Sequence, residues 1–288
     1  MSSELETLRR QIDEIDTALH DLMRKRTAIV EHIGRAKGAD GRLALRPGRE
    51  ALVLRRLLER HDGNFPRAAL VRMWREMISA VTGLQCDFSV AVCVPEEQRG
   101  FWDMARDHFG IQAPMRRHTT PARVLSDIAE DANVVGMLPL PVEGDPQPWW
   151  PALNSAEPTT PCIVARAPFY RTDNPRTEGL SALVLARLQP EPSGPEEAGL
   201  DRSLLILESP ADLSRSRISS ALAQAGMPAF TSAIRHDLAG GGMLYLVELP
   251  AFIIAGDPRL GAIEQALATP NLRLTPVGAY AVPVDLAG

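Results

Sequence analysis

Apolar residues recur along the first part of the chain in alternating steps of three and four. This spacing is typical of one face of an α-helix and predicts a single helix over residues 5–37. At about 1.5 Å per residue that helix is roughly 50 Å long, more than one small domain can cover, so we expect its partner to be another chain. The apolar positions are Leu5, Leu8, Ile12, Ile15, Leu19, Leu22, Ile29 and Ile33.

Two shorter helices are predicted between this long helix and residue 87. Pro47 begins the first of them, because proline is tolerated in the first turn of a helix. The second follows Pro66 and carries apolar residues at helical spacing as far as Leu84, with Gln85 just beyond. The sequence therefore predicts a helical domain over residues 1–87.

After Asp87 short apolar runs alternate with amphipathic stretches, which predicts α/β layers over residues 88–187. Residues 188–199 have the composition of a linker. Residues 200–288 then follow the order strand, helix, strand, strand, helix, strand, which is a ferredoxin-like topology. The predicted fold class is a multidomain α plus α/β protein. Its strands are expected at 88–94, 133–140, 162–167, 180–188, 203–209, 228–236, 243–253 and 272–284.

Composition and charge exclude several kinds of protein. Hydrophobic residues make up 45% of the chain and charged residues 23%, as in soluble globular proteins. No run approaches the roughly 18 apolar residues of a membrane span, and the charged N-terminus has no apolar signal core, so we expect a cytoplasmic protein without a membrane partner. The three cysteines have neither disulfide nor zinc spacing.

The net charge of −5 is unevenly distributed. Residues 1–87 hold 16 basic and 13 acidic side chains, whereas the remaining residues hold 15 basic and 23 acidic ones. This distribution argues against a nucleic-acid partner for most of the chain and leaves room for a small anionic ligand in the first region.

Arg26 and Lys37 occupy steps of the long helix at which the next apolar residue is due. A long cation at the edge of an apolar face can extend its charge into water, and this interpretation is open for either residue alone. Two cations on one stripe favour a dry cavity for an anion. Arg49 and Glu50 in a first helical turn, and Gln85 after the third helix, can line the same cavity, although such positions are also common on solvated surfaces.

The segments LRRQIDEID, RKR, GRAK, RPGRE and TGLQ follow one another between residues 5 and 86. In this order and spacing they resemble the all-helical class of chorismate mutases. The resemblance implies a three-helix domain that forms an intertwined homodimer with shared active sites. It also implies conversion of chorismate to prephenate without a cofactor or a metal.

The resemblance assigns roles to individual positions. Arg9, Arg26 and Arg49 correspond to the arginines that hold the two carboxylates of chorismate. Lys37 and Gln85 correspond to the residues that hydrogen-bond to its ether oxygen. In this rearrangement the ether bond lengthens and negative charge gathers on its oxygen, so fixed donors around a compact conformer supply orientation and electrostatic stabilisation. Arginine suits carboxylates because its fork is bidentate and its charge persists on burial.

Three further positions belong to the same comparison. Glu50 corresponds to the residue that accepts a hydrogen bond from the ring hydroxyl. Arg46 stands where family members often have an acidic residue, which alters the expected hydroxyl pocket. Val81 stands where many have a serine, which removes one carboxylate contact. Neither departure removes the pair at the ether oxygen.

The rest of the chain resembles the prephenate dehydratase part of bifunctional chorismate mutase/prephenate dehydratases, with an ACT-like unit at residues 200–288. The catalytic Thr-Arg-Phe motif of that enzyme falls on Thr160, Pro161 and Cys162, so only the threonine is retained. We therefore expect a degenerate dehydratase scaffold. The unit also lacks the Glu-Ser-Arg-Pro motif of phenylalanine-sensing relatives, which leaves an aromatic amino acid effector open.

The predicted function is thus a homodimeric chorismate mutase of aromatic amino acid biosynthesis, with a non-catalytic C-terminal portion. One alternative is a bifunctional chorismate mutase/prephenate dehydratase. Another is a catalytically silent, amino-acid-binding regulator of the same pathway.

Overall fold

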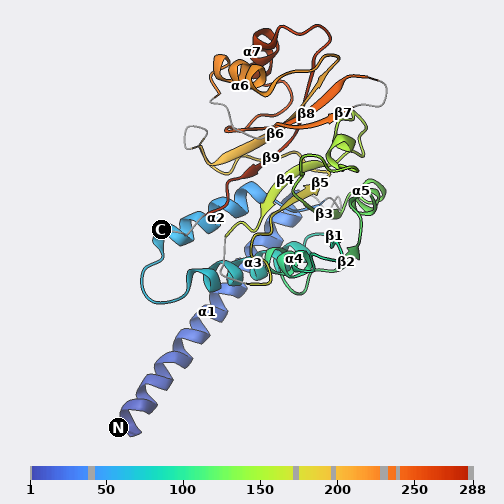
Figure 1. Ribbon diagram of the computed structural model, residues 1–288. Coiled ribbons are helices and arrows are strands. Elements are labelled where there is room, and N and C mark those ends of the chain that lie inside the picture. The colour runs from blue at the N-terminus through green and yellow to red at the C-terminus, as the bar shows by residue number, and fades with distance from the viewer. Residues whose placement is uncertain are drawn as a thin grey trace.

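The computed structural model describes residues 2–37, 43–170, 175–195, 199–227, 233–237 and 241–284. N-terminal helices precede a layered α/β region (Figure 1). The helices are α1 (Ser2–Lys37), α2 (Pro47–Arg60), α3 (Arg67–Gly83), α4 (Gly100–Phe109), α5 (Pro121–Glu130), η1 (Trp150–Leu153), α6 (Arg215–Gln224) and α7 (Pro258–Leu267). The strands are β1 (Ser89–Cys93), β2 (Met115–His118), β3 (Val134–Pro139), β4 (Cys162–Ala167), β5 (Ala182–Ala186), β6 (Asp201–Ser209), β7 (Ala233–Asp237), β8 (Met243–Leu249) and β9 (Arg273–Ala281).

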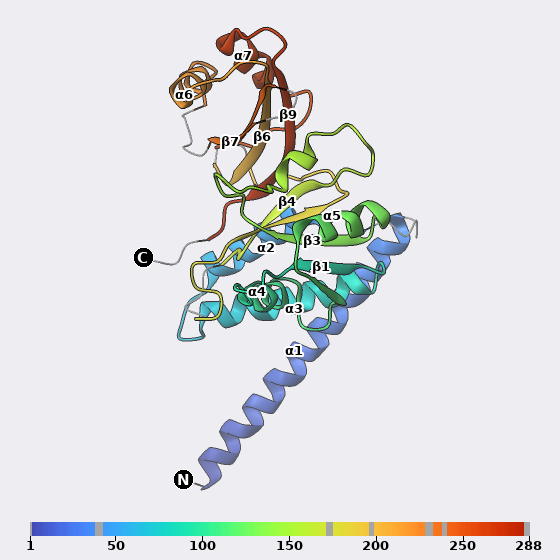
Figure 2. The ribbon, with the colours of Figure 1, turned by 45° about the vertical axis from the view of Figure 1, so that its right-hand side comes forward.

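Helix α1 is continuous over the predicted length, but its apolar stripe is not buried within the chain. The large apolar side chains from Leu5 to Ile33 are between 44% and 62% exposed. Figures 1 and 2 show the N-terminal half of α1 projecting beyond all other elements. Among the described residues no helix is long and apolar enough to cross a membrane. The apolar stripe of α1 is therefore uncovered within the single chain, and its expected burial against another chain stays a prediction.

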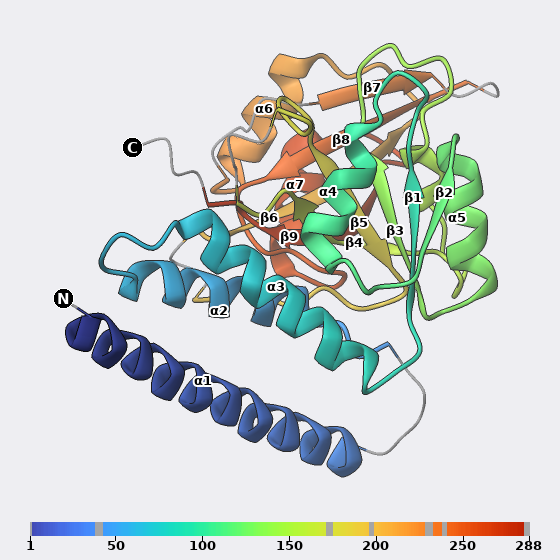
Figure 3. The ribbon, with the colours of Figure 1, turned by 90° about the horizontal axis from the view of Figure 1, so that it is seen from below.

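Helices α2 and α3 are packed against each other and against the α/β region. Leu54 and Leu58 of α2 share a buried cluster with Val71 of α3. The same cluster contains Phe169 and Tyr170, which follow β4. The view from below in Figure 3 shows these two helices lying between α1 and the sheet.

The predicted α/β layers are confirmed by a sheet whose β1 pairs in parallel with β3 and β2. Alternate residues of β1 point to opposite faces, as in any strand. Val90 and Val92 pack with α4, whereas Ala91 and Cys93 pack with α5. The sequence did not predict β2, because this edge strand is half exposed and carries two consecutive arginines in place of an apolar run.

The C-terminal residues form the predicted ferredoxin-like unit, with strand order β9-β6-β8-β7 and all pairs antiparallel. Helices α6 and α7 pack on one face of these strands. Its sheet is continuous with that of the preceding region, because β4 pairs with β9 at Ile163 and Gly278. A Cβ on Gly278 would lie 2.1 Å from the carbonyl oxygen of Ile163, and the residue has φ +139°, so only glycine fits this junction.

Residues 191–193 of the predicted linker lie against α2 and its N-cap. The Arg46 side chain contacts Glu191 at 2.9 Å, and a Cβ on Gly48 would lie 2.5 Å from the carbonyl oxygen of Glu191. Arg55 Nη1 donates to Ser193 Oγ at 2.6 Å. This segment therefore joins the helical region to the strands that follow it.

Arg55 is the centre of a buried hydrogen-bond network at this junction. Its side chain is 8% exposed, and its Nη2 donates to the carbonyl oxygens of Leu200 at 3.0 Å and Val282 at 2.7 Å. Burial lowers the pKa of the guanidinium, an effect that the nearby charge of Asp201 opposes. The sequence did not predict this role, since the three acceptors lie on distant parts of the chain.

Replacing Arg55→Ala should lower the free energy of unfolding by about 3 kcal/mol, because the hydrogen bonds of this buried guanidinium to Ser193, Leu200 and Val282 are lost. Urea unfolding followed by tryptophan fluorescence measures this effect. Arg56→Ala is the matched control, since Arg56 is exposed on the same helix and its loss should cost less than about 0.5 kcal/mol. Equal unfolding midpoints for the two variants would contradict the assignment.

Candidate functional site

Arg26 carries an unsatisfied donor on the inner side of α1. The residue is half-buried, and its Nη1 atom is buried without a hydrogen-bond partner among the described residues. Buried polar groups in folded proteins are almost always paired. The unpaired guanidinium nitrogen of Arg26 therefore indicates a hydrogen-bond acceptor that the described chain does not provide. A carboxylate is the partner whose geometry and charge fit it best.

The C-terminal part of α1 approaches the end of α3. A Cβ on Gly34 would lie 3.5 Å from Cγ and 3.8 Å from Oε1 of Gln85, so the helix backbone is adjacent to this side chain. Among the described residues Gln85 donates from Nε2 only to the carbonyl oxygen of Val81, at a long 3.4 Å. Lys37 is the last residue of α1, one turn after Gly34, and its side chain lies outside the described part of the structure.

Glu50 forms a buried ion pair that the sequence did not predict. Its Oε2 accepts from Arg75 Nη1 at 2.7 Å, and the two side chains are 11% and 7% exposed. Burial lowers the pKa of Arg75, and the adjacent Glu50 opposes that shift. Glu50 thus already has a cationic partner in the chain. The apolar spacing of α3 gave no signal of this pair, since Arg75 falls between the stripe residues Trp74 and Met77.

The other predicted residues occupy three different surroundings. Arg49 is exposed in the first turn of α2. Arg46, at the N-cap of that helix, is directed to Glu191. Val81 is buried and accepts the Gln85 hydrogen bond through its backbone.

Arg9 is not brought near the other candidates by its own chain. It is exposed on α1, 17 positions before Arg26, which corresponds to roughly 25 Å along a helix. A small ligand held by Arg26 is therefore out of reach of Arg9 of the same chain.

Arg26 and Gln85 each offer a hydrogen-bond donor that the described chain leaves unpaired or weakly paired. Donors of this kind can hold and orient an anion and stabilise charge that develops on an oxygen. All eight predicted positions, from Arg9 to Gln85, also lie within one contiguous match to a known family. Residues 8–85 match the model of the family described as Chorismate mutase type II.

Residues 8–85 form a chorismate mutase type II domain. The match covers the three N-terminal helices, from the second turn of α1 to just beyond α3. It does not extend to the α/β region.

Two curated relatives are similar over a longer stretch than this domain. One is a bifunctional chorismate mutase/prephenate dehydratase of Aquifex aeolicus, 32% identical over 129 residues, which are 43% of this chain and 34% of that protein. Another, of the same name and from Stutzerimonas stutzeri, is 27% identical over 146 residues, 48% of this chain and 39% of that protein. The aligned part of this chain spans little more than a third of either relative.

Among solved structures, the chain is similar to a prephenate dehydratase from Streptococcus mutans. The sequence identity is 16% and the TM-score 0.47, over 69% of this chain and all of that structure.

The three positions of the expected dehydratase motif lie at the start of β4. Pro161 is buried just before the strand, and Thr160 donates its backbone N–H to the carbonyl oxygen of Glu157. Burial raises the pKa of the Cys162 thiol, so it is protonated at neutral pH. Neither Pro161 nor this neutral thiol can hold a carboxylate as an arginine would.

Proposed function

We propose that the protein is a chorismate mutase that converts chorismate to prephenate at a site built around Arg26. The observation that carries the proposal is the buried Nη1 of Arg26, which lacks a partner within the described residues of a chorismate mutase type II domain. A domain that had lost its ligand would gain stability by replacing this residue with an apolar one.

The proposed mechanism needs only binding and electrostatics. Arg26 and Arg49 hold carboxylates of the dianion, which favours the compact conformer that reacts. Lys37 and Gln85 donate to the ether oxygen as its negative charge grows, and this interaction is stronger in the transition state than in the ground state. Glu50 accepts from the ring hydroxyl while it remains paired with Arg75.

The exposed stripe of α1 supports a dimer in which a second copy covers it. Large apolar patches on a soluble protein mark interaction surfaces, and this one runs along almost the whole helix. In an isologous dimer with antiparallel α1 helices, Arg9 of the second copy reaches the site that contains Arg26. Each pocket is then shared between two chains.

The region after residue 87 is proposed to lack dehydratase activity, since Pro161 replaces the motif's arginine.

The second candidate function is a bifunctional chorismate mutase/prephenate dehydratase. It is favoured by the length of the alignment with relatives of that name, 129 and 146 residues, which exceeds residues 8–85. A silent regulator that binds an aromatic amino acid in the ACT-like unit is the third. Separate assays for each product distinguish the three.

When chorismate is supplied, we expect prephenate to accumulate. Lys37→Ala should lower kcat/KM for this step at least about a hundredfold, because a donor to the developing charge is lost. Lys25→Ala is the matched control, since Lys25 is an exposed lysine of the same helix and its removal should change little. Absence of mutase activity in the wild-type chain would refute the proposal and favour the silent regulator.

The same preparation, given prephenate directly, should form phenylpyruvate no faster than buffer at neutral pH. Enzyme-dependent phenylpyruvate that persists in the Lys37→Ala variant would establish the bifunctional alternative.

A second prediction concerns the donor at position 85. Gln85 is neutral at every pH of interest, so mutase activity should be nearly flat from pH 6 to pH 8. Gln85→Glu can donate to the ether oxygen only when its carboxyl is protonated, so its rate should climb as the pH falls. Identical pH profiles for the two proteins would remove Gln85 from the site.

A third prediction tests the shared pocket. Arg9→Ala and Lys37→Ala homodimers should both be nearly inactive. When the two variants are co-expressed, random pairing makes about half of the dimers mixed, and each mixed dimer has one pocket that lacks both residues and one intact pocket. About a quarter of the wild-type activity per site should therefore return. No recovery in preparations shown to contain mixed dimers would mean that Arg9 does not act across the interface.

A further inference from the structure

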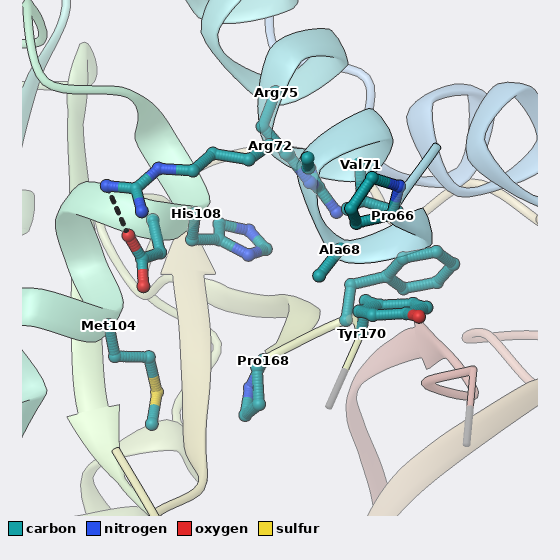
Figure 4. Close-up of a pocket in the computed structure, with 12 residues that line it drawn as sticks. Pro66, Ala68, Val71, Arg72, Arg75, Met104, His108, Pro168 and Tyr170 are labelled. Atoms are coloured by element: carbon teal, nitrogen blue, oxygen red, sulfur yellow. Dashed lines mark ion pairs between the residues drawn. The ribbon is translucent and has the colours of Figure 1, made fainter. Parts of the chain in front are cut away.

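A cavity of about 440 Å³ lies between α3, α4 and the segment that follows β4 (Figure 4). This volume is within the range of pockets that hold small molecules, roughly 300–1,000 Å³. Its walls are mostly apolar, and none of the residues assigned to the mutase site contributes to them. The apolar lining includes Pro66, Val71, Met104, Pro168, Phe169 and Tyr170.

His108 is the polar group inside this cavity whose bonding is incomplete. The residue is 9% exposed, lines the cavity and makes no hydrogen bond within the described residues. Its ring packs edge-on against Phe109 at 4.7 Å between centroids. Figure 4 shows the imidazole within the ring of lining side chains. The imidazole nitrogen atoms thus have no hydrogen-bond partner among the described residues, and as part of the cavity lining they are available to a polar group of a bound molecule.

His108 is suited to a hydrogen bond with a neutral polar group and not to an ion pair. Burial, with the positive charge of Arg75 as a second cause, lowers the pKa of the imidazole well below its ordinary value. The ring is therefore neutral at neutral pH and offers one donor and one acceptor. A hydroxyl, keto or amino group can pair with it.

Two groups of charged residues border the cavity: the ion pair of Arg75 with Glu50, which has no net charge, and an adjoining hollow with an excess of positive charge. Arg75 lies 5.4 Å from the centroid of the Phe169 ring and is neutralised by Glu50. A second hollow of about 200 Å³ shares Arg72 and Asp107 with the cavity. It is lined by three arginines and two aspartates, so positive charge exceeds negative there.

Arg106 supplies the accessible part of that positive charge. Arg72 is paired with Asp107 at 3.0 Å, as the dashed line in Figure 4 marks. Arg106 is half-buried and has neither an ion pair nor a hydrogen bond within the described part of the chain. A single carboxylate suits this excess of one charge, whereas a polyphosphate would need several cations.

We propose that this cavity binds a small aromatic carboxylate. Its ring lies against Phe169 and Met104, where offset or edge contacts between aromatic rings and contacts with sulfur are favourable. A polar substituent pairs with His108, and the carboxylate points to Arg72 and Arg106. The proposal does not depend on mutase activity, because no residue of the proposed mutase site lines the cavity.

Titration of the full chain with 3-phenylpropionate, followed by calorimetry at pH 7 without chorismate, tests the site. We expect saturable binding with one ligand per chain. The neutral analogue 3-phenylpropionamide should bind at least about tenfold more weakly, because it carries no negative charge to pair with Arg106. Absence of saturable binding, or equal affinity for the two ligands, would overturn the proposal.

Variants locate the binding. Met104→Trp fills the cavity and should abolish binding, whereas Met73→Trp, at an exposed position of α3, should leave it unchanged. Arg106→Gln keeps the apolar packing intact and should weaken 3-phenylpropionate about tenfold without affecting the amide, so the test holds even if Met104→Trp does not fold. Unchanged affinity in Arg106→Gln and in folded Met104→Trp would place any binding elsewhere.

Discussion

Two buried arginines that contact the same aromatic ring hold the helical region against the sheet. Arg55 of α2 and Arg75 of α3 lie 5.5 and 5.4 Å from the centroid of the Phe169 ring. Arg55 donates to backbone carbonyls of the C-terminal region, and Arg75 is paired with Glu50. Buried guanidinium groups are tolerated only when such partners satisfy them, so each arginine also fixes the position of the groups that it binds.

This attachment fixes two helices of the chorismate mutase type II domain, α2 and α3, against the sheet and leaves the apolar stripe of the third, α1, uncovered. Helices α2 and α3 are held by buried contacts, and they carry Arg49, Glu50 and Gln85. Helix α1 has its apolar stripe exposed, and it carries Arg26 with its unpaired nitrogen. The proposed site therefore has a rigid half within the chain, and its other half depends on what covers α1.

The same attachment separates two proposed ligand sites. Arg75 contributes to the wall of the cavity that contains His108, and through Glu50 it contacts a residue proposed for chorismate binding. The two sites thus lie on either side of one buried ion pair, and each requires different chemistry. One offers unpaired donors to a dianion, and the other offers an apolar cavity with one cationic edge.

The sequence by itself determined the elements whose signal is local. The three-and-four spacing predicted α1, and the apolar runs predicted most strands. The order of strands and helices along the C-terminal part of the chain predicted its ferredoxin-like unit. Arg26 was predicted because a cation interrupted an apolar stripe. Only the tertiary structure decided the rest: Arg75 and Glu50 are 25 positions apart, Arg55 and Val282 are 227 apart, and β4 joins β9 at one glycine. Such partners depend on how distant elements pack, and no local pattern of apolar and polar residues encodes that packing.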